Sequence, residues 1–149
     1  MTAHPLALAI TPIDDTDVAG VIALWRACHL TRPWNDPAAD IALARKGSNA
    51  TVLVGRDSRS IVATVLVGHD GHRGWVYYLA VDPDHRQKGY GRVMMDAAER
   101  WLRECGIEKL QLMVRPDNKS VKSFYQSLGY SEQERVIYAK WLDGREPTP

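Results

Sequence analysis

The chain has 149 residues, 45% of them apolar and 25% charged, with a formal net charge of +1 at pH 7. This length suits one domain, 1–149, and the near-neutral charge predicts no nucleic-acid or anionic-membrane partner. No apolar run approaches the roughly 20 residues of a membrane span. Residues 1–8 lack the basic and apolar regions of a secretory signal. We therefore expect a cytoplasmic protein, whose Cys28 and Cys105 are free thiols.

The N-terminal half alternates apolar-periodic segments with turn residues. Apolar residues that recur at three- and four-residue steps predict helices, and short β-branched runs predict strands. Asp36 and Pro37 are typical of a helix start. The expected elements are a strand over 6–10, a helix over 14–28, a helix over 37–47, and a hairpin of strands over 51–56 and 60–68.

The C-terminal half predicts strands and helices in alternation. The expected elements are a strand over 75–81 buried on both faces, a helix over 89–105, a strand over 109–115, a helix from Asp117 or Asn118 to Leu128, and one or two closing strands over 130–142. A helical crossover makes the strands on either side of it parallel. The tail from about residue 144 is polar and Pro-rich, so we expect it to fray.

The segment between the strand over 75–81 and the helix over 89–105 carries the main chemical signal. The first amide hydrogens of a helix have no partner within it and carry partial positive charge, so a helix start binds anions. Gly89 and Gly91 lack side chains that would hold a phosphate away from the backbone. Arg86, Lys88 and Arg92 add positive charge. The pattern suits a diphosphate, although an ordinary left-handed turn with exposed basic residues would look similar.

Two common phosphate-binding motifs do not fit this segment. The mononucleotide P-loop requires Gly-x-x-x-x-Gly-Lys-Ser/Thr, which the chain lacks. The dinucleotide motif requires a third glycine at the position of Met94. Arg86-x-x-Gly89-x-Gly91, which follows an apolar strand and Val81-Asp82-Pro83, instead resembles the acyl-CoA-binding motif of the GNAT N-acetyltransferases.

The resemblance covers essentially residues 6–142, in matching element order, and includes Asn118 and the run Phe124-Tyr125-x-x-Leu128-Gly129-Tyr130. Segments 32–36 and 70–74 also resemble the small bacterial YpeA-like branch. The family implies an α/β (α+β) fold in one domain: a central mixed, mostly antiparallel twisted sheet of six to seven strands, flanked by about four helices. It also implies that the strands beside the 89–105 helix separate and make room for the cofactor.

The resemblance implies a transfer of an acetyl or other acyl group from acetyl-CoA to a primary amine, without a metal. Tyr125 would protonate the leaving CoA thiolate, since a phenol is a plausible general acid. A core tyrosine is the alternative for Tyr125. The remaining cofactor-binding residues are the backbone of Leu79, Ala80 and Val81 for the pantetheine arm, Asn118 for the same arm, and Arg86, Gln87, Lys88, Gly89, Tyr90, Gly91 and Arg92 for the pyrophosphate. A backbone amide beside Leu79 or Ala80 would stabilise the oxyanion.

The attacking amine must lose a proton, and the sequence leaves its general base open. Some relatives that acetylate protein N-termini have a glutamate in the fifth strand, where this chain has Met113. His72 ranks first among the candidates because its intrinsic pKa is suitable. The other candidates are His69, Asp70, Tyr77 and Tyr78.

The acceptor is expected to be a small-molecule or protein amine. Arg32 and Trp34, in the loop between the first two helices, and Tyr77 are candidate substrate-binding residues. A loop tryptophan that covers the core is an equally good interpretation of Trp34. The protein would act as a monomer or homodimer. A CoA-binding regulatory module without catalysis is the main alternative function, and a nucleic-acid-binding domain is a weaker one.

Overall fold

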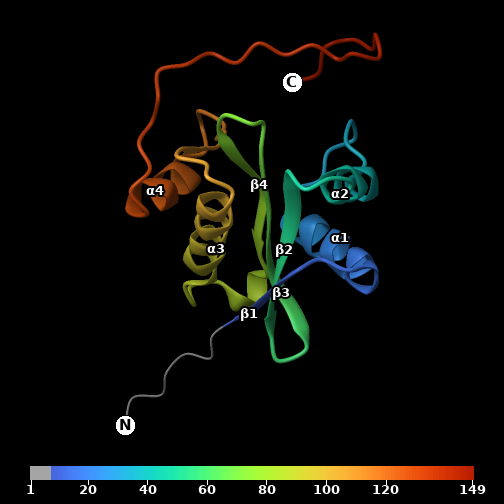
Figure 1. The fold of residues 1–149 in the computed structure, drawn as a ribbon, viewed down its shortest axis with the longest axis vertical. Helices are drawn as coiled ribbons and strands as arrows, with labels where there is room; N and C mark the ends of the chain where they lie inside the picture. The colour runs from blue at the N-terminus through green and yellow to red at the C-terminus, as the bar shows by residue number, and fades with distance from the viewer. Residues whose placement is uncertain (1–7) are drawn as a thin grey trace. The chain divides into compact units, whose positions relative to one another are not determined.

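The structure is a computed structural model that describes residues 8–149 (Figure 1). The chain divides into two compact units, Met1–Leu112 and Met113–Pro149. In chain order, the elements are β1 (Ala9–Pro12), the 3-10 helix η1 (Asp15–Asp17), α1 (Val18–Ala27), α2 (Pro37–Arg45), β2 (Ala50–Asp57), β3 (Ser60–His69), β4 (Gly74–Val81), the 3-10 helix η2 (Pro83–His85), α3 (Tyr90–Glu104), β5 (Leu110–Gln111) and α4 (Lys119–Ser127).

The strands of the first unit form one sheet in the order β1-β2-β3-β4-β5. The ladders from β1 to β4 are antiparallel, whereas β4 and β5 are parallel, as the crossover through α3 predicts. The predicted α/β class and the mostly antiparallel sheet are therefore confirmed. The predicted count of six to seven strands is wrong for residues 8–149, where the sheet has five.

Helices cover both faces of this sheet (Figure 1). α3 packs on one face, while α1 and α2 pack on the other. The buried stripe of α3 includes Met94, Met95 and Leu102, which recur at helical spacing. Gly74 allows the close approach of α3 to β4, because a Cβ there would lie 2.4 Å from Leu102 Cδ1. The helices thus enclose a valine-rich sheet between two apolar layers.

The middle of the sheet lies on β3, not on β4 as the sequence predicts. β3 has a continuous buried run over residues 62–65. In β4, Tyr77 is 45% exposed, so the expectation of a strand buried on both faces is wrong. The reason is the short neighbour β5, which covers only the first two residues of β4.

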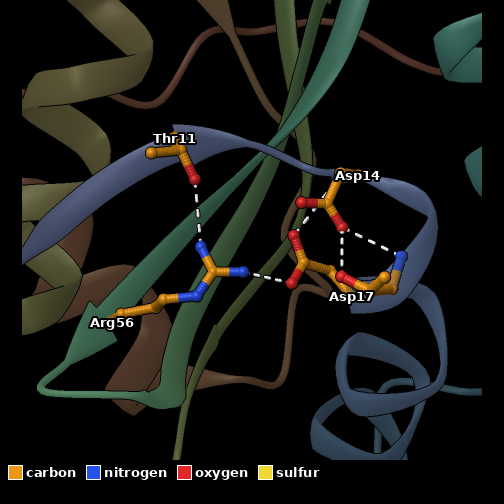
Figure 2. A network of polar contacts seen from close by, with 5 residues as sticks. Thr11, Asp14, Asp17 and Arg56 are labelled. Carbon is orange, nitrogen blue, oxygen red and sulfur yellow. Dashed lines mark hydrogen bonds and ion pairs between the residues drawn. The ribbon is translucent and has the colours of Figure 1, made fainter.

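An ion pair joins the start of α1 to the sheet (Figure 2). The Arg56 guanidinium pairs with the buried Asp17 carboxylate and donates to Thr11 Oγ1 at 3.0 Å. Asp17 Oδ2 also accepts from the Asp14 amide at 3.0 Å, which completes a capping box around η1. The bond from Arg56 holds the pKa of Asp17 below its usual range.

Most predicted helices are confirmed, with small changes at their ends. The helix predicted over 14–28 divides into η1 and α1, and α2 begins after the Asp36 cap as expected. The strand predicted over 6–10 lies over Ala9–Pro12, and its positions 6 and 7 fall outside the described residues. Within residues 8–149, no helix has the length and apolar character to cross a membrane, and no three His, Cys, Asp or Glu side chains gather as a metal-binding group.

The second unit contains α4 followed by an extended segment. Asn118 caps α4, and Gly129, with φ of 93°, ends it as predicted. The closing strands predicted over 130–142 do not form, and Val136 and Tyr138 are 81% and 94% exposed. A strand requires a partner for its backbone groups, and the second unit contains no other strand.

Candidate active site

The second half of β4 has one edge without a neighbouring strand in residues 8–149. The β4–β5 ladder joins only the first two residues of β4, whereas Ala80 and Val81 pair with β3 on the other side. An unpaired strand edge can bind an extended ligand through its N–H and C=O groups. Leu79, Ala80 and Val81 all lie on this stretch, although the Val81 carbonyl already accepts a hydrogen bond from the Cys28 thiol at 3.2 Å.

A β-bulge interrupts β4 directly before this edge. Tyr78 and Leu79 together lie opposite the single residue Val65 of β3. Tyr78 has φ of 53°, a left-handed conformation that costs a non-glycine residue on the order of 1–2 kcal/mol. Bulges redirect backbone groups, and no glycine in the sequence marked this one.

After β4 the chain makes a turn that ends at the N-terminus of α3. The Asp82 carboxylate accepts a hydrogen bond from the Asp84 amide at 2.9 Å and caps η2. Gln87 and Gly89 then take left-handed conformations, with φ of 66° and 80°. A Cβ added at Gly89 would meet no heavy atom within 4 Å, so the space beside the turn is open.

Five backbone amides of this turn have no acceptor among residues 8–149: those of Gln87, Lys88, Gly89, Tyr90 and Gly91. The first three of these residues are exposed. Unpaired amides at a helix N-terminus carry partial positive charge and point their hydrogens at an anion. The turn therefore has the donors and the electric field that a diphosphate requires.

The side chains around the turn divide into two groups. Arg86, Lys88 and Arg92 are exposed and place positive charge beside the amides. The Tyr90 side chain is 7% exposed, and its hydroxyl donates to Asp57 Oδ2 at 3.1 Å. Tyr90 can therefore offer the turn its amide, while its ring anchors the start of α3 to the end of β2.

Asn118 and Tyr125 belong to the second unit. Asn118 Oδ1 accepts from the Val121 amide at 3.3 Å and thereby caps α4. Tyr125 is half-buried between the rings of Phe124 and Tyr130, with centroid distances of 5.0 and 5.8 Å. Burial raises the pKa of Tyr125 to about 12, so its phenol keeps its proton at neutral pH.

The candidate substrate-binding residues lie in two places in the first unit. Arg32 donates from its guanidinium to the carbonyls of His29 and Thr31, at 2.8 and 2.9 Å, so part of its donor capacity serves its own loop. Trp34 is half-buried in the same loop. Tyr77 is the exposed tyrosine of β4, and burial of part of its ring raises its pKa.

The structure does not bring His72 to the bulge. His72 lies in the turn before β4, and Leu79 follows seven positions later. A strand rises about 3.3 Å per residue, so the two are on the order of 20 Å apart. His69, the last residue of β3, and Asp70, in the same turn as His72, accept hydrogen bonds from backbone amides. Such bonds, that from Arg73 first, hold the pKa of Asp70 below its usual range.

Three residues that the sequence did not single out surround the bulge. Trp25 stacks on Tyr78, with ring centroids 3.7 Å apart. Asp40 Oδ2 accepts from the Tyr78 hydroxyl at 2.7 Å, and the Thr64 hydroxyl donates to the Tyr78 carbonyl at 3.0 Å. The available signal in the sequence was Thr64, a polar residue within an otherwise apolar strand.

Comparison with known proteins identifies the family. The model of the acetyltransferase (GNAT) family matches residues 18–130. An acetyltransferase of Yersinia enterocolitica is 39% identical over 91% of this chain and 96% of its own length. An acetyltransferase of Pectobacterium atrosepticum is 40% identical over 85% of this chain and 89% of its own length. The chain therefore belongs to the acetyltransferase (GNAT) family.

Solved structures share the fold at low sequence identity. The aminoglycoside N-acetyltransferase AAC(6')-Iy in complex with CoA has a TM-score of 0.80 at 18% identity, covering 95% of this chain and 99% of that one. A ribosomal-protein-alanine N-acetyltransferase of Brucella melitensis has a TM-score of 0.72 at 20% identity, covering 91% and 99%. The predicted fold and the predicted class, an acyl-CoA-dependent N-acetyltransferase, are confirmed.

Proposed function

We propose that this protein transfers an acetyl group from acetyl-CoA to a primary amine by direct attack of the amine on the thioester. The observation that carries the proposal is the set of unpaired amides from Gln87 to Gly91 at the start of α3. Every helix start leaves its first four amides without a partner within the helix. Here the run begins earlier, at Gln87 and Lys88, and continues through the N-cap Gly89 into α3. Such a run of donors beside open space can bind an anion that has several acceptor oxygens.

The cofactor would lie along the end of β4 and the turn that follows. The pyrophosphate would accept hydrogen bonds from the turn amides, and the positive charges of Arg86, Lys88 and Arg92 would attract it. The pantetheine arm would add to the β4 edge at Leu79–Val81 as an extra strand does. In this proposal Asn118 offers its side-chain amide to the same arm.

The reaction forms one bond and breaks one. The amine nitrogen attacks the thioester carbonyl carbon, and negative charge develops on the carbonyl oxygen, where the Leu79 amide would stabilise it. The C–S bond then breaks, and Tyr125 donates its proton to the CoA thiolate. The products are an N-acetylated amine and CoA.

The nitrogen must also lose a proton, because an alkyl amine with a pKa of about 10.4 is mostly protonated at neutral pH. His72 remains the sequence-based candidate for the base, but its separation from the bulge favours proton transfer through water. We expect Tyr77, Arg32 and Trp34 to face the acceptor. The similar solved structures include an aminoglycoside N-acetyltransferase and a ribosomal-protein-alanine N-acetyltransferase, so a small polyamine and a protein N-terminus are both acceptors to test.

Thermal stability with and without donor tests the proposal. A ligand present at 100 times its Kd adds about 2.7 kcal/mol to the free energy of unfolding. That gain corresponds to a rise in Tm of roughly 5–10 °C for a chain of this size. Acetyl-CoA should give this shift, and a panel of amines should contain one that releases free thiol. No shift with any short acyl-CoA at millimolar concentration would refute the proposal.

A CoA-binding regulatory module without catalysis is the second candidate. Met113, at the position where some relatives have a glutamate, is the observation in its favour, since a thioether cannot take a proton from the amine. A thermal shift with acetyl-CoA, combined with no thiol release across the amine panel, would favour the module over the enzyme.

A further inference from the structure

Tyr78 holds a backbone conformation that requires support. A non-glycine residue in the left-handed region persists when the surrounding contacts determine its conformation more than once. In Tyr78 the ring, the hydroxyl and the carbonyl each have a partner within the first unit. The partners come from α1, α2 and β3, so three separate elements act on one bulge residue.

The ring and the hydroxyl are fixed by two helices. Trp25 of α1 is fully buried and lies nearly parallel to the Tyr78 ring, with 6° between the planes. Asp40 of α2 accepts from the hydroxyl. Burial first, and then the Asp40 carboxylate, raise the pKa of Tyr78, so the phenol remains the donor in this bond at neutral pH. Tyr78 is therefore unsuited to serve as the base.

The carbonyl of Tyr78 is fixed by Thr64, which is fully buried in β3. The indole Nε1–H of Trp25 donates to Thr64 Oγ1 at 2.9 Å. Because an indole nitrogen can only donate, the Thr64 oxygen is the acceptor there and its own hydrogen is left for the Tyr78 carbonyl. The direction of both hydrogen bonds follows from this chemistry.

Thr64 also determines where the next amide points. The peptide bond between Tyr78 and Leu79 is trans, because the described residues contain no cis peptide bond. In a planar trans peptide the C=O and N–H groups point in opposite directions. With the Tyr78 carbonyl directed at Thr64, the Leu79 N–H is directed away from it.

We infer that Thr64 and Asp40 are positioning residues: acting through Tyr78, they aim the Leu79 amide at the thioester carbonyl oxygen. This inference rests on the proposed function, in which that amide stabilises the oxyanion. A donor that is fixed before the substrate arrives needs no reorganisation during the reaction, which is the condition for electrostatic catalysis. Trp25 contributes by fixing both the Tyr78 ring and the Thr64 hydroxyl.

The test is the carbonyl stretching frequency of bound acetyl-CoA labelled with ¹³C at the thioester carbon. In the unaltered protein the band should lie below that of free acetyl-CoA, because a hydrogen bond from Leu79 weakens the C=O bond. Thr64→Val keeps the side-chain shape but removes the hydroxyl, so the band should return toward the free value. Thr64→Ser should restore it. Tyr78→Phe, which removes the bond to Asp40 but keeps the ring, should shift the band toward the free value as Thr64→Val does, but by less.

Turnover should fall in the variants in which the carbonyl band moves toward the free value. A displacement of the donor by about 1 Å can lower the rate on the order of 100-fold. We expect Thr64→Val to lower kcat by about 10- to 100-fold while the Kd for acetyl-CoA stays within about twofold, a split that general loss of structure would not produce. Thr51→Val, the same change at a half-buried position of β2, is the matched control and should change neither quantity.

Each outcome decides the inference. If Thr64→Val does not fold, Tyr78→Phe supplies the same readout. Variants that bind acetyl-CoA and keep the band of the unaltered protein would overturn the positioning role and leave the proposed function intact. If the unaltered protein itself binds acetyl-CoA without a change of the band, the Leu79 amide is not the donor and the inference is wrong. Absence of acetyl-CoA binding in the unaltered protein would overturn both.

Discussion

The bulge of β4 and the turn after it differ in where their backbone groups find partners. At the bulge, Tyr78 is held by Trp25, Asp40 and Thr64, so its geometry is determined by the protein. In the turn, the amides from Gln87 to Gly91 have no acceptor within residues 8–149. The bulge is suited to a task that requires fixed geometry, whereas the turn is suited to a ligand that supplies its missing partners.

Because of this difference, we expect changes in the two regions to have separable kinetic effects. Interactions made more strongly in the transition state change kcat, while interactions made equally with the bound substrate change affinity. Changes near the reacting atoms should therefore lower kcat, and changes in the turn should raise the Kd for acetyl-CoA.

The largest effect is expected from Tyr125→Phe. Loss of a general acid lowers turnover by about 10²- to 10⁴-fold, and the Kd for acetyl-CoA should stay nearly constant because the phenol contributes little to binding. Tyr138→Phe, at a side chain that is 94% exposed, is the control. Steady-state kinetics and calorimetry measure the two quantities. A rise in Kd that accounts for the whole loss of kcat/KM would contradict the role of Tyr125.

The pH dependence sharpens the same prediction. Since burial raises the pKa of Tyr125 to about 12, the phenol stays protonated through the neutral range and beyond. Turnover should therefore show no fall from loss of this proton between pH 7 and pH 10. A decrease over that range that Tyr125→Phe abolishes would show that the phenol titrates lower and acts in another way.

A pair of glycines tests the turn. Gly89 and Gly106 lie at the two ends of α3, both have φ of 80°, and a Cβ on either would meet no heavy atom within 4 Å. Each change to alanine should therefore cost about the same stability, on the order of 1–2 kcal/mol, from the left-handed backbone. Only Gly89→Ala should raise the Kd for acetyl-CoA, by about tenfold or more, because it disturbs hydrogen bonds to a charged group. Equal affinity in both variants would contradict the diphosphate site.

The smallest effect on activity is expected from Asp17→Asn, which lies outside both regions. Loss of the partner of Arg56 should lower the free energy of unfolding by about 1–3 kcal/mol at neutral pH. The pKa of Asp17 is lowered in the folded protein, so this stabilisation is present above the unfolded pKa of about 3.9 and is lost as the pH falls through the folded value. Denaturant unfolding should show that the difference in free energy of unfolding between the unaltered protein and Asp17→Asn becomes smaller as the pH falls toward 3. A constant difference would mean that Asp17 is not the titrating group.

The sequence predicted the turn far better than the bulge. Gly89, Gly91 and the basic residues are neighbours along the chain, so their pattern is visible without a structure. The support of the bulge joins Asp40 and Thr64 to Tyr78 across 38 and 14 positions, and Trp25 to Thr64 across 39 positions. Such contacts exist only after folding. Thr64, a polar residue in an apolar strand, was the only feature of the sequence that indicated these contacts.

The strand errors have a similar cause. Residues 130–142 contain the β-branched and aromatic residues typical of strands, but propensity does not supply the neighbouring strand that pairing requires. The helices were predicted more accurately because their hydrogen bonds are local, and caps such as Asp36 and Gly129 mark their ends. Local features such as caps and the basic turn can therefore be predicted from this sequence, whereas strand pairing and the long-range contacts around Tyr78 cannot.

The most direct test of the proposed diphosphate site is a ¹H–¹⁵N NMR titration that compares CoA with pantetheine, which lacks the pyrophosphate. We expect the amide signals of Gln87, Lys88, Gly89, Tyr90 and Gly91 to shift strongly with CoA and little with pantetheine, because the phosphates supply the acceptors for these donors. Saturation with CoA that leaves these five signals in place, while others move, would contradict the proposed site.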